Sequence, residues 1–149
     1  MRRHLEVIGV EGGGTSTHAL RIRATVVVKQ AVQQAVQQAV QQSGGFATAV
    51  IESWNVEDSV EAALGTNPWA LTGKVGEVER RVREVTQHWE LAAERVAAMG
   101  LTMSGFGGRT EASQLEEGLK DCAQEVCVSG DATGPWHSIS TNAAVVIIA

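Results

Sequence analysis

The chain has 149 residues, 44% of them hydrophobic, and its 12 Lys and Arg against 17 Asp and Glu give a formal net charge of −5. This length supports one domain with a real core, and the acidic balance speaks against nucleic acid or an anionic membrane as partner, because both need a basic face. No apolar run is long enough for a signal peptide or approaches the ~20 residues that span a bilayer. We therefore predict a cytoplasmic protein.

The first predicted structure is a β-hairpin around a glycine-rich turn. Residues 5–10 and 19–28 are apolar and β-branched, and Glu11, three glycines at 12–14 and Thr15 lie between them. Glycines tolerate positive φ, so their N–H groups could converge on one phosphate, to which Thr15 would add a hydroxyl. Glu11 would lie beside that anion and could hold Mg²⁺ through water. A tight turn without a ligand is the alternative, and no Gly-Lys-Ser/Thr follows to make a Walker motif.

A low-complexity repeat comes next. Residues 31–42 read Ala-Val-Gln-Gln three times, which places Val32, Val36 and Val40 at four-residue spacing. Each repeat turns about 400° around a helix, so the valine stripe drifts and makes a poor coiled-coil seam. We expect a protruding helix or mobile arm within an insertion at about residues 25–48, because long surface insertions cost little. A helix that binds a partner is the alternative interpretation.

Regular patterns resume after the repeat. Residues 46–54 predict a third strand, and 55–57 predict the turn that follows it. Over 75–89, valines and a final Trp recur at spacings of three and four between charged residues, which predicts an amphipathic helix. A short apolar strand is expected at 99–103, with the loop 104–108 beyond its C-terminal end.

The last part of the chain alternates between segments with the apolar pattern of a helix and segments with that of a strand. Leu115, Leu119 and Cys122 predict another helix, and residues 125–128 predict a strand that ends near Asp131. We expect a short helix over 134–141, with a proline near its first turn, and then an apolar β-branched strand over 143–149. Asp131 then lies beyond the carboxyl end of a strand, where ligands of open α/β sheets collect.

The side chains that often bind metals are scattered. Cys122 and Cys127 lie five positions apart with no second pair to complete a zinc site, so we predict reduced, partly buried thiols. The four histidines form no ligand-spaced pair, and we interpret all of them as surface or partly packed groups.

Four short motifs follow one another along the chain: Gly-Val-Glu-Gly-Gly-Gly-Thr at 9–15, Thr-Asn-Pro-Trp at 66–69, Gly-Leu-Thr-Met-Ser-Gly at 100–105 and Gly-Asp-Ala-Thr-Gly at 130–134. In this order they resemble the first lobe of N-acetylglucosamine kinases, within the actin-like ATPase and sugar-kinase superfamily. The resemblance implies an α/β fold of the ribonuclease H-like (actin-like ATPase) type. Its mixed sheet would have about five strands, three antiparallel and then two parallel, with flanking helices.

The resemblance also implies a domain organisation. Residues 1–149 would form the N-terminal lobe, with the insertion at about 25–48, and the second lobe would be absent. In the family, the strand expected at 143–149 leads into a second phosphate turn and then the lobe that carries the adenosine site. With that lobe absent we expect little or no turnover, because lobe closure excludes water and completes the site.

The activity implied is ATP-dependent phosphorylation of N-acetylglucosamine to N-acetylglucosamine 6-phosphate, with ATP and Mg²⁺ as cofactors. The implied residues are Asp131 as catalytic base; Asn67, Trp69, Ser104, Gly105 and Asp131 for the sugar; Gly12, Gly13, Gly14 and Thr15 for the nucleotide phosphates; and Glu11 for Mg²⁺ through water. An amide suits sugar recognition because its oxygen accepts from one hydroxyl while its NH₂ donates to the next.

Other interpretations of the same residues stay open. Taken alone, Asp131 is better explained as a cap of the short helix after it, and Asn67 as a helix or turn cap. Pro135 and Trp136 depart from the small residues that follow the family's catalytic loop, and a shift of about 1 Å in Asp131 could cost ~100-fold in rate.

Two further functions are the alternatives to a kinase lobe. One is a non-catalytic fragment of the same fold that binds sugar weakly or pairs with a partner, including a second copy of the chain. The other is an ATPase activator of the same superfamily that energises electron transfer, for which two cysteines five apart are a poor fit to an iron–sulfur cluster.

Overall fold

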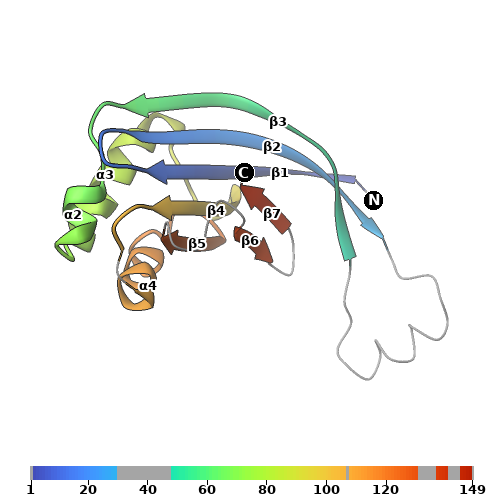
Figure 1. The fold of residues 1–149 in the computed structure, drawn as a ribbon. Coiled ribbons are helices and arrows are strands. Elements are labelled where there is room, and N and C mark those ends of the chain that lie inside the picture. The colour runs from blue at the N-terminus through green and yellow to red at the C-terminus, as the bar shows by residue number, and fades with distance from the viewer. Residues whose placement is uncertain (1, 30–47, 107, 131–136, 141–144, 149) are drawn as a thin grey trace, which may run out of the picture.

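A five-stranded sheet forms the centre of the molecule (Figure 1). The computed structural model describes residues 2–29, 48–106, 108–130, 137–140 and 145–148. The strands stand in the order β3-β2-β1-β4-β5. Their bounds are β1 Arg2–Gly12, β2 Thr17–Lys29, β3 Thr48–Ala62, β4 Val96–Met103 and β5 Glu125–Gly130.

The directions of the strands identify the fold. β1 pairs with β2 and β2 with β3 in antiparallel fashion, whereas β4 runs parallel to β1 and β5 runs parallel to β4. Three antiparallel strands followed by two parallel ones, in the order 3-2-1-4-5, make up the ribonuclease H-like sheet. The predicted fold class and its mixed five-stranded sheet are confirmed.

Two helices, α3 (Val75–Thr86) and α4 (Arg109–Gly118), cover one face of this sheet. Side chains of both helices share one core with the facing side chains of β1 and β4, including Val78, Val82, Leu115, Ile8, Val10, Met99 and Leu101. The apolar positions of α3 recur every three or four residues, so burying them leaves its charged residues toward solvent. The predicted helix is confirmed, and the 3₁₀ turn η1 (Gln87–Trp89) completes its last part. The short helix α2 (Asn67–Leu71) precedes α3.

The end of the chain differs from its prediction. Residues 137–140, expected within a helix over 134–141, form strand β6 (His137–Ser140). β6 pairs antiparallel with β7 (Val145–Ile148), which lies within the strand predicted at 143–149. The helix prediction is wrong because the β-branched segment that follows supplies a partner, and pairing satisfies the backbone groups of both segments. β7 also contacts β3 and β4 of the main sheet.

The predicted turn at residues 55–57 is also wrong. β3 continues through these residues, and Asn55 pairs with Arg23 while Val56 pairs with Ile22. The register shifts between Arg21 and Ile22, which leaves Glu57 as an extra residue on β3, and such a bulge is common at a sheet edge. The polar run that resembled a turn is therefore the exposed part of an edge strand.

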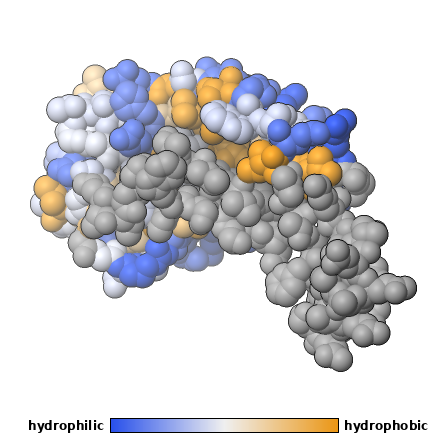
Figure 2. Space-filling view, turned by 45° about the vertical axis from the view of Figure 1, so that its right-hand side comes forward, coloured by the Kyte–Doolittle hydropathy of each residue, from blue (hydrophilic) through white to orange (hydrophobic). Residues whose placement is uncertain are grey.

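The surface combines charged and apolar side chains. Trp54, Val56, Leu64 and Leu71 are exposed, and Figure 2 shows hydrophobic patches among charged ones on one face. Residues 25–29 of the predicted insertion belong to β2, whereas the Ala-Val-Gln-Gln repeat lies outside the described residues. Among the described residues, no helix has both the length and the apolar character needed to cross a membrane.

Candidate functional site

The glycine-rich turn joins β1 to β2, as predicted, but its backbone differs from the expectation. None of the glycines at 12–14 has positive φ; among the described glycines, Gly73 and Gly105 do. The N–H of Gly13 donates to the carbonyl oxygen of Ser16 at 2.9 Å and is therefore not free for an anion. The carbonyl oxygen of Gly13 accepts from the N–H groups of Thr66 and Asn67 at 3.1 and 3.2 Å.

Close packing explains why Gly12 has no side chain. A Cβ at this position would lie 2.1 Å from Oγ1 of Thr66 and 2.6 Å from Sδ of Met103, closer than real Cβ contacts allow. Thr66 is fully buried there, and its hydroxyl donates to the Met103 sulfur at 3.6 Å. Gly12 thus makes room for the segment before α2, and this role does not involve a ligand.

The outer half of the turn retains groups that can bind an anion. Gly14 and Thr15 are exposed, and within the described part of the chain their N–H groups donate to no other protein group. Glu11, at the end of β1, is exposed beside them. Two free N–H groups and a hydroxyl next to a carboxylate are compatible with a phosphate whose charge is shared with Mg²⁺.

Three of the predicted sugar residues meet at the next loop. The side-chain amide of Asn67 donates to Oγ of Ser104 at 2.9 Å. Gly105 has φ +95°, and a Cβ there would lie 3.0 Å from Nδ2 of Asn67 and 3.1 Å from Cγ of Leu71. A left-handed backbone this close to an amide requires glycine. The structure therefore brings Asn67, Ser104 and Gly105 together, whereas their roles remain predictions.

Trp69, the fourth predicted sugar residue that the structure describes, lies in a different environment. Its ring is partly buried against the main core, and the guanidinium carbon of Arg81 lies 5.5 Å from the ring centroid. Arg81 is itself buried, and its Nη1 lies 3.2 Å from Glu84. These contacts give Trp69 a packing role in joining α2 to α3.

The carboxyl ends of the parallel strands meet beside this group. Gly12 is in register with Met103, and Met103 with Gly130, so β1, β4 and β5 end at one edge of the sheet. The N–H of Ser104 donates to the carbonyl oxygen of Gly12 at 2.9 Å. Asp131 follows Gly130 directly but lies outside the described residues, so its position opposite the glycine turn stays a prediction.

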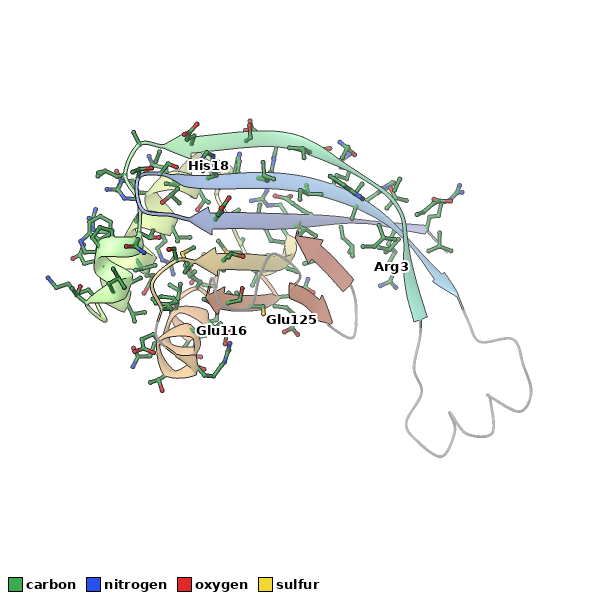
Figure 3. All side chains as sticks on the ribbon, in the orientation of Figure 1. Arg3, His18, Glu116 and Glu125 are labelled. Atoms are coloured by element: carbon green, nitrogen blue, oxygen red, sulfur yellow. The ribbon has the colours of Figure 1, made fainter. Side chains whose placement is uncertain are left out.

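A row of polar side chains crosses the sheet one residue before this edge. Glu61, His18, Glu11, Thr102 and Ser129 are paired in register across all five strands. They share the face opposite α3 and α4, because directly paired residues point the same way and Val10 and Leu101, their neighbours on β1 and β4, face the helices. His18 shares a 3.0 Å hydrogen bond with Ser16 and lies 3.6 Å from Glu61; Figure 3 labels it near the turn. Strand spacing alone does not reveal this row, because it depends on the register of four pairings.

The carboxylate groups of the described residues are compatible with Mg²⁺ bound together with a phosphate, whereas the described carboxylate, imidazole and thiol groups do not form a site for a metal ion held by protein side chains alone. Among the described residues, no group of three or more His, Cys, Asp or Glu could hold a metal ion by itself. Mg²⁺ needs only one or two carboxylates when substrate phosphates supply the other oxygens, so Glu11 beside the turn is compatible with it. Cys122 is buried and Cys127 half-buried, and burial raises the pKa of both thiols. They are free cysteines, as predicted.

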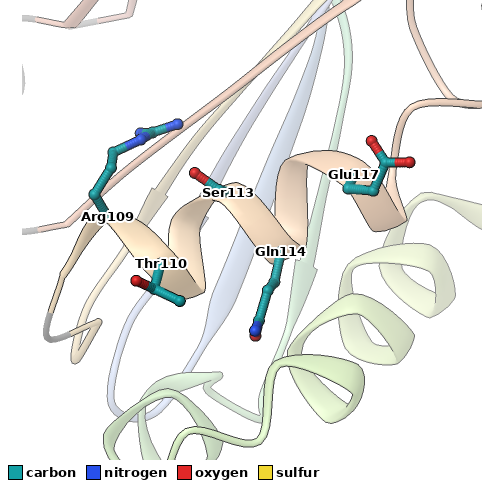
Figure 4. A pocket seen from close by; sticks show the side chains of 5 residues that line it. All are labelled: Arg109, Thr110, Ser113, Gln114 and Glu117. Atoms are coloured by element: carbon teal, nitrogen blue, oxygen red, sulfur yellow. The ribbon is translucent and has the colours of Figure 1, made fainter.

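One surface hollow lies elsewhere in the described part of the chain. Arg109, Thr110, Ser113, Gln114 and Glu117 line it along α4 (Figure 4). None of the predicted site residues belongs to it. A hollow lined by one helix is open to solvent, so it offers little enclosure for a ligand.

Comparisons with known proteins find distant structural likenesses among solved structures, including the following two. No protein-family model and no curated protein sequence matches the chain. A member of the Ppx/GppA protein family from Aquifex aeolicus is similar at 13% identity and a TM-score of 0.32, over 89% of this chain and 37% of that one. RuvC from Thermus thermophilus is similar at 17% identity and a TM-score of 0.28, over 85% of this chain and 64% of that one. TM-scores this low carry no argument about function, and the fold assignment rests on the strand order.

Three residues that build this region are not among the site residues predicted from the sequence. Gly65, Thr17 and Met103 hold the backbone of the glycine turn against the segment before α2. Glycine and threonine are common in loops, and their partners lie about 40 to 50 positions away along the chain. No local pattern could therefore have identified them.

Proposed function

We propose that the chain is the first lobe of an N-acetylglucosamine kinase, which transfers the terminal phosphoryl group of ATP to the 6-hydroxyl of the sugar. One observation carries the proposal: the glycine turn and the Asn67–Ser104–Gly105 group form one hydrogen-bonded unit at the carboxyl edge of the parallel strands. Phosphoryl transfer requires a phosphate site beside a site for the acceptor alcohol, because the two reacting groups must be held next to each other.

Each residue has a task in this proposal. The N–H groups of Gly14 and Thr15 donate to phosphate oxygens, and Glu11 holds Mg²⁺ through water. Bound Mg²⁺ supplies charge neutralisation on the phosphates. The Asn67 amide and the Ser104 hydroxyl orient sugar hydroxyls, while Gly105 leaves space beside them. Asp131, assigned by resemblance alone, takes the proton of the 6-hydroxyl.

The 149-residue chain tests the binding part of this function. A single lobe leaves the nucleotide open to water, so we expect sugar binding with little or no turnover. Isothermal titration with N-acetylglucosamine should show binding to the wild type. Asn67→Ala should weaken it about tenfold, which corresponds to ~1.4 kcal/mol.

Asn55→Ala is the matched control. Asn55 is an exposed asparagine on β3, far from the turn along its strand, so its loss should leave the sugar affinity unchanged. Absence of sugar binding by the wild type would end the sugar-kinase proposal. An equal loss of sugar affinity in Asn67→Ala and Asn55→Ala would show that Asn67 is not part of the sugar site.

The exposed apolar residues of β3 favour one other function. Trp54 and Val56 are 64% and 45% exposed on an edge strand, and exposed apolar patches often mark interaction surfaces. Self-association in analytical ultracentrifugation, unchanged in Asn67→Ala and lost in Trp54→Ser, would favour an interaction module.

A further inference from the structure

Gly65 faces Gly13 and Gly14 where the glycine turn crosses the segment before α2. A Cβ on Gly65 would lie 2.1 Å from the carbonyl oxygen of Gly13 and 2.6 Å from the carbonyl carbon and oxygen of Gly14. All three contacts are backbone atoms, so no side-chain rotation could relieve them. Gly65 is buried, and its missing side chain is what allows the two backbones to touch.

Hydrogen bonds on both sides of Gly65 hold the 64–67 segment against the glycine turn and β2. Before it, the hydroxyl of Thr17, which is fully buried on β2, donates to the carbonyl oxygen of Leu64 at 3.1 Å. After it, Thr66 and Asn67 donate their N–H groups to the carbonyl oxygen of Gly13. The backbone of Asn67 is therefore fixed by the turn itself.

The side chain of Asn67 is fixed from the other direction. Its amide donates to Ser104, whose N–H in turn donates to the carbonyl oxygen of Gly12. The bonds form a closed circuit from Gly12 through Ser104 and Asn67 to Gly13. Displacement of the 64–67 segment would break this circuit at the amide that the proposed function assigns to the sugar.

We propose that Gly65 and Thr17 are positioning residues for the sugar, acting through Asn67. The glycine turn then has two tasks: its inner half, Gly12 and Gly13, supports the sugar residue, and its outer half, Gly14 and Thr15, faces the phosphate. This inference rests on the proposed function. It adds that sugar binding depends on Gly65 and Thr17, and that anion binding does not depend on Thr17.

The test measures two ligands separately on the full chain. N-acetylglucosamine and magnesium tripolyphosphate are titrated by calorimetry into the wild type, Gly65→Ala, Thr17→Val and Thr17→Ser. Thr17→Val should weaken sugar binding about tenfold and change tripolyphosphate binding by less than about twofold. Gly65→Ala should weaken the binding of both ligands, because the Gly14 carbonyl that its Cβ would displace shares a peptide unit with the N–H of Thr15. Thr17→Ser keeps the hydroxyl and should bind both ligands like the wild type.

Gly76→Ala is the matched control for the glycine substitution. Gly76 lies in α3, and a Cβ there would meet nothing within 4 Å, so both affinities should be unchanged. A purely structural role of Thr17 would make Thr17→Val lower the apparent binding of both ligands together, in proportion to the folded fraction. If Gly65→Ala does not fold, the Thr17→Val and Thr17→Ser pair decides, because neither adds an atom to the crossing.

The outcomes separate this inference from the proposed function. A wild type that binds no sugar overturns the proposed function, and the inference with it. A wild type that binds both ligands, with equal losses of both in Thr17→Val or no loss of sugar affinity, overturns only the positioning role. A wild type that binds sugar but no tripolyphosphate overturns the division of the turn into two tasks.

Discussion

The three consecutive glycines of the turn have three different physical roles. A Cβ on Gly12 would collide with Thr66 and Met103, a Cβ on Gly13 would lie 3.4 Å from the Ser16 carbonyl oxygen, and a Cβ on Gly14 would meet nothing within 4 Å. The sequence predicts the turn because three glycines interrupt two apolar runs. It could not predict the role of Gly12, because the Thr66 and Met103 atoms that decide it belong to residues far along the chain.

This difference predicts opposite outcomes for one substitution at neighbouring positions. Gly12→Ala should lower the free energy of unfolding by about 1–3 kcal/mol, because a methyl group is forced against the buried Thr66 side chain. Gly14→Ala should change it by less than about 0.5 kcal/mol, as surface substitutions usually do. Urea denaturation followed by circular dichroism measures both. A neutral Gly12→Ala would mean that the 64–67 segment is not packed on the turn.

At the scale of elements, one arginine joins the two helices of the core layer. Arg83 of α3 donates through two nitrogens to the Asp121 carboxylate, which follows α4, at 2.6 and 3.1 Å. It also donates to the carbonyl oxygen of Gly118 at 2.7 Å and to Glu79 within α3 at 3.0 Å. Arg80, in contrast, pairs only with Glu77 and Glu84 of the same helix among the described residues.

We therefore expect Arg83→Met to cost more stability than Arg80→Met. Arg83→Met should lower the free energy of unfolding by about 1 kcal/mol, the upper end for half-exposed pairs, because the bond to Asp121 is bidentate. Arg80→Met removes only exposed pairs within one helix, worth about 0.3–0.5 kcal/mol. Equal effects in urea denaturation would contradict a tie between α3 and α4.

The same pair makes stability depend on pH in a defined direction. The hydrogen bond from Arg83 lowers the pKa of Asp121 below its usual value. A carboxylate with a lowered folded-state pKa stabilises the protein above the unfolded pKa of about 3.9, and this stabilisation is lost as the pH falls through the folded value. The advantage of the wild type over Asp121→Asn should thus be full at pH 7 and shrink below about pH 4. An advantage that grew in acid would contradict this assignment.

Elements whose own sequence contains a full helical or strand pattern were predictable, whereas elements that form because they pair with another strand were not. The valine spacing of α3 identifies its buried side without reference to the rest of the fold. β3 contains residues 55–57, whose polar Asn55 and Glu57 resemble a turn, yet pairing with β2 keeps them extended. Residues 137–140 lack a decisive pattern of their own, and the β-branched strand that follows turns them into a hairpin partner.

At the scale of the whole molecule, the topology explains how motifs far apart in sequence form one site. β1, β3, β4 and β5 run in the same direction, because β2 is antiparallel to both β1 and β3, so the segments that follow these four strands begin at the same edge of the sheet. The order of the motifs predicted this convergence through the resemblance, and the positions of Asn67, Ser104 and Gly105 agree with it. The supporting residues Gly65 and Thr17 follow from backbone packing in three dimensions, which no sequence pattern expresses.

The same topology predicts a gradient of protection across the sheet. Residues 7–10 of β1 are buried between two paired strands, as is almost all of β4, whereas most of residues 51–62 of β3 are exposed on an edge. Hydrogen exchange followed by mass spectrometry should find the slowest amides in β1 and β4, which open only with global unfolding, and faster exchange in β3.

The edge strand gives this prediction its sharpest control. Glu52, Glu57, Asp58 and Glu61 make β3 acidic, and charged edges discourage pairing with a second copy. Exchange in β3 should therefore be the same at low and high protein concentration. If β3 became as protected as β4 at high concentration, two edges would be pairing despite their charge. Such a result would favour the interaction-module function over a monomeric kinase lobe, because the exposed Trp54 and Val56 would lie in a contact between two copies.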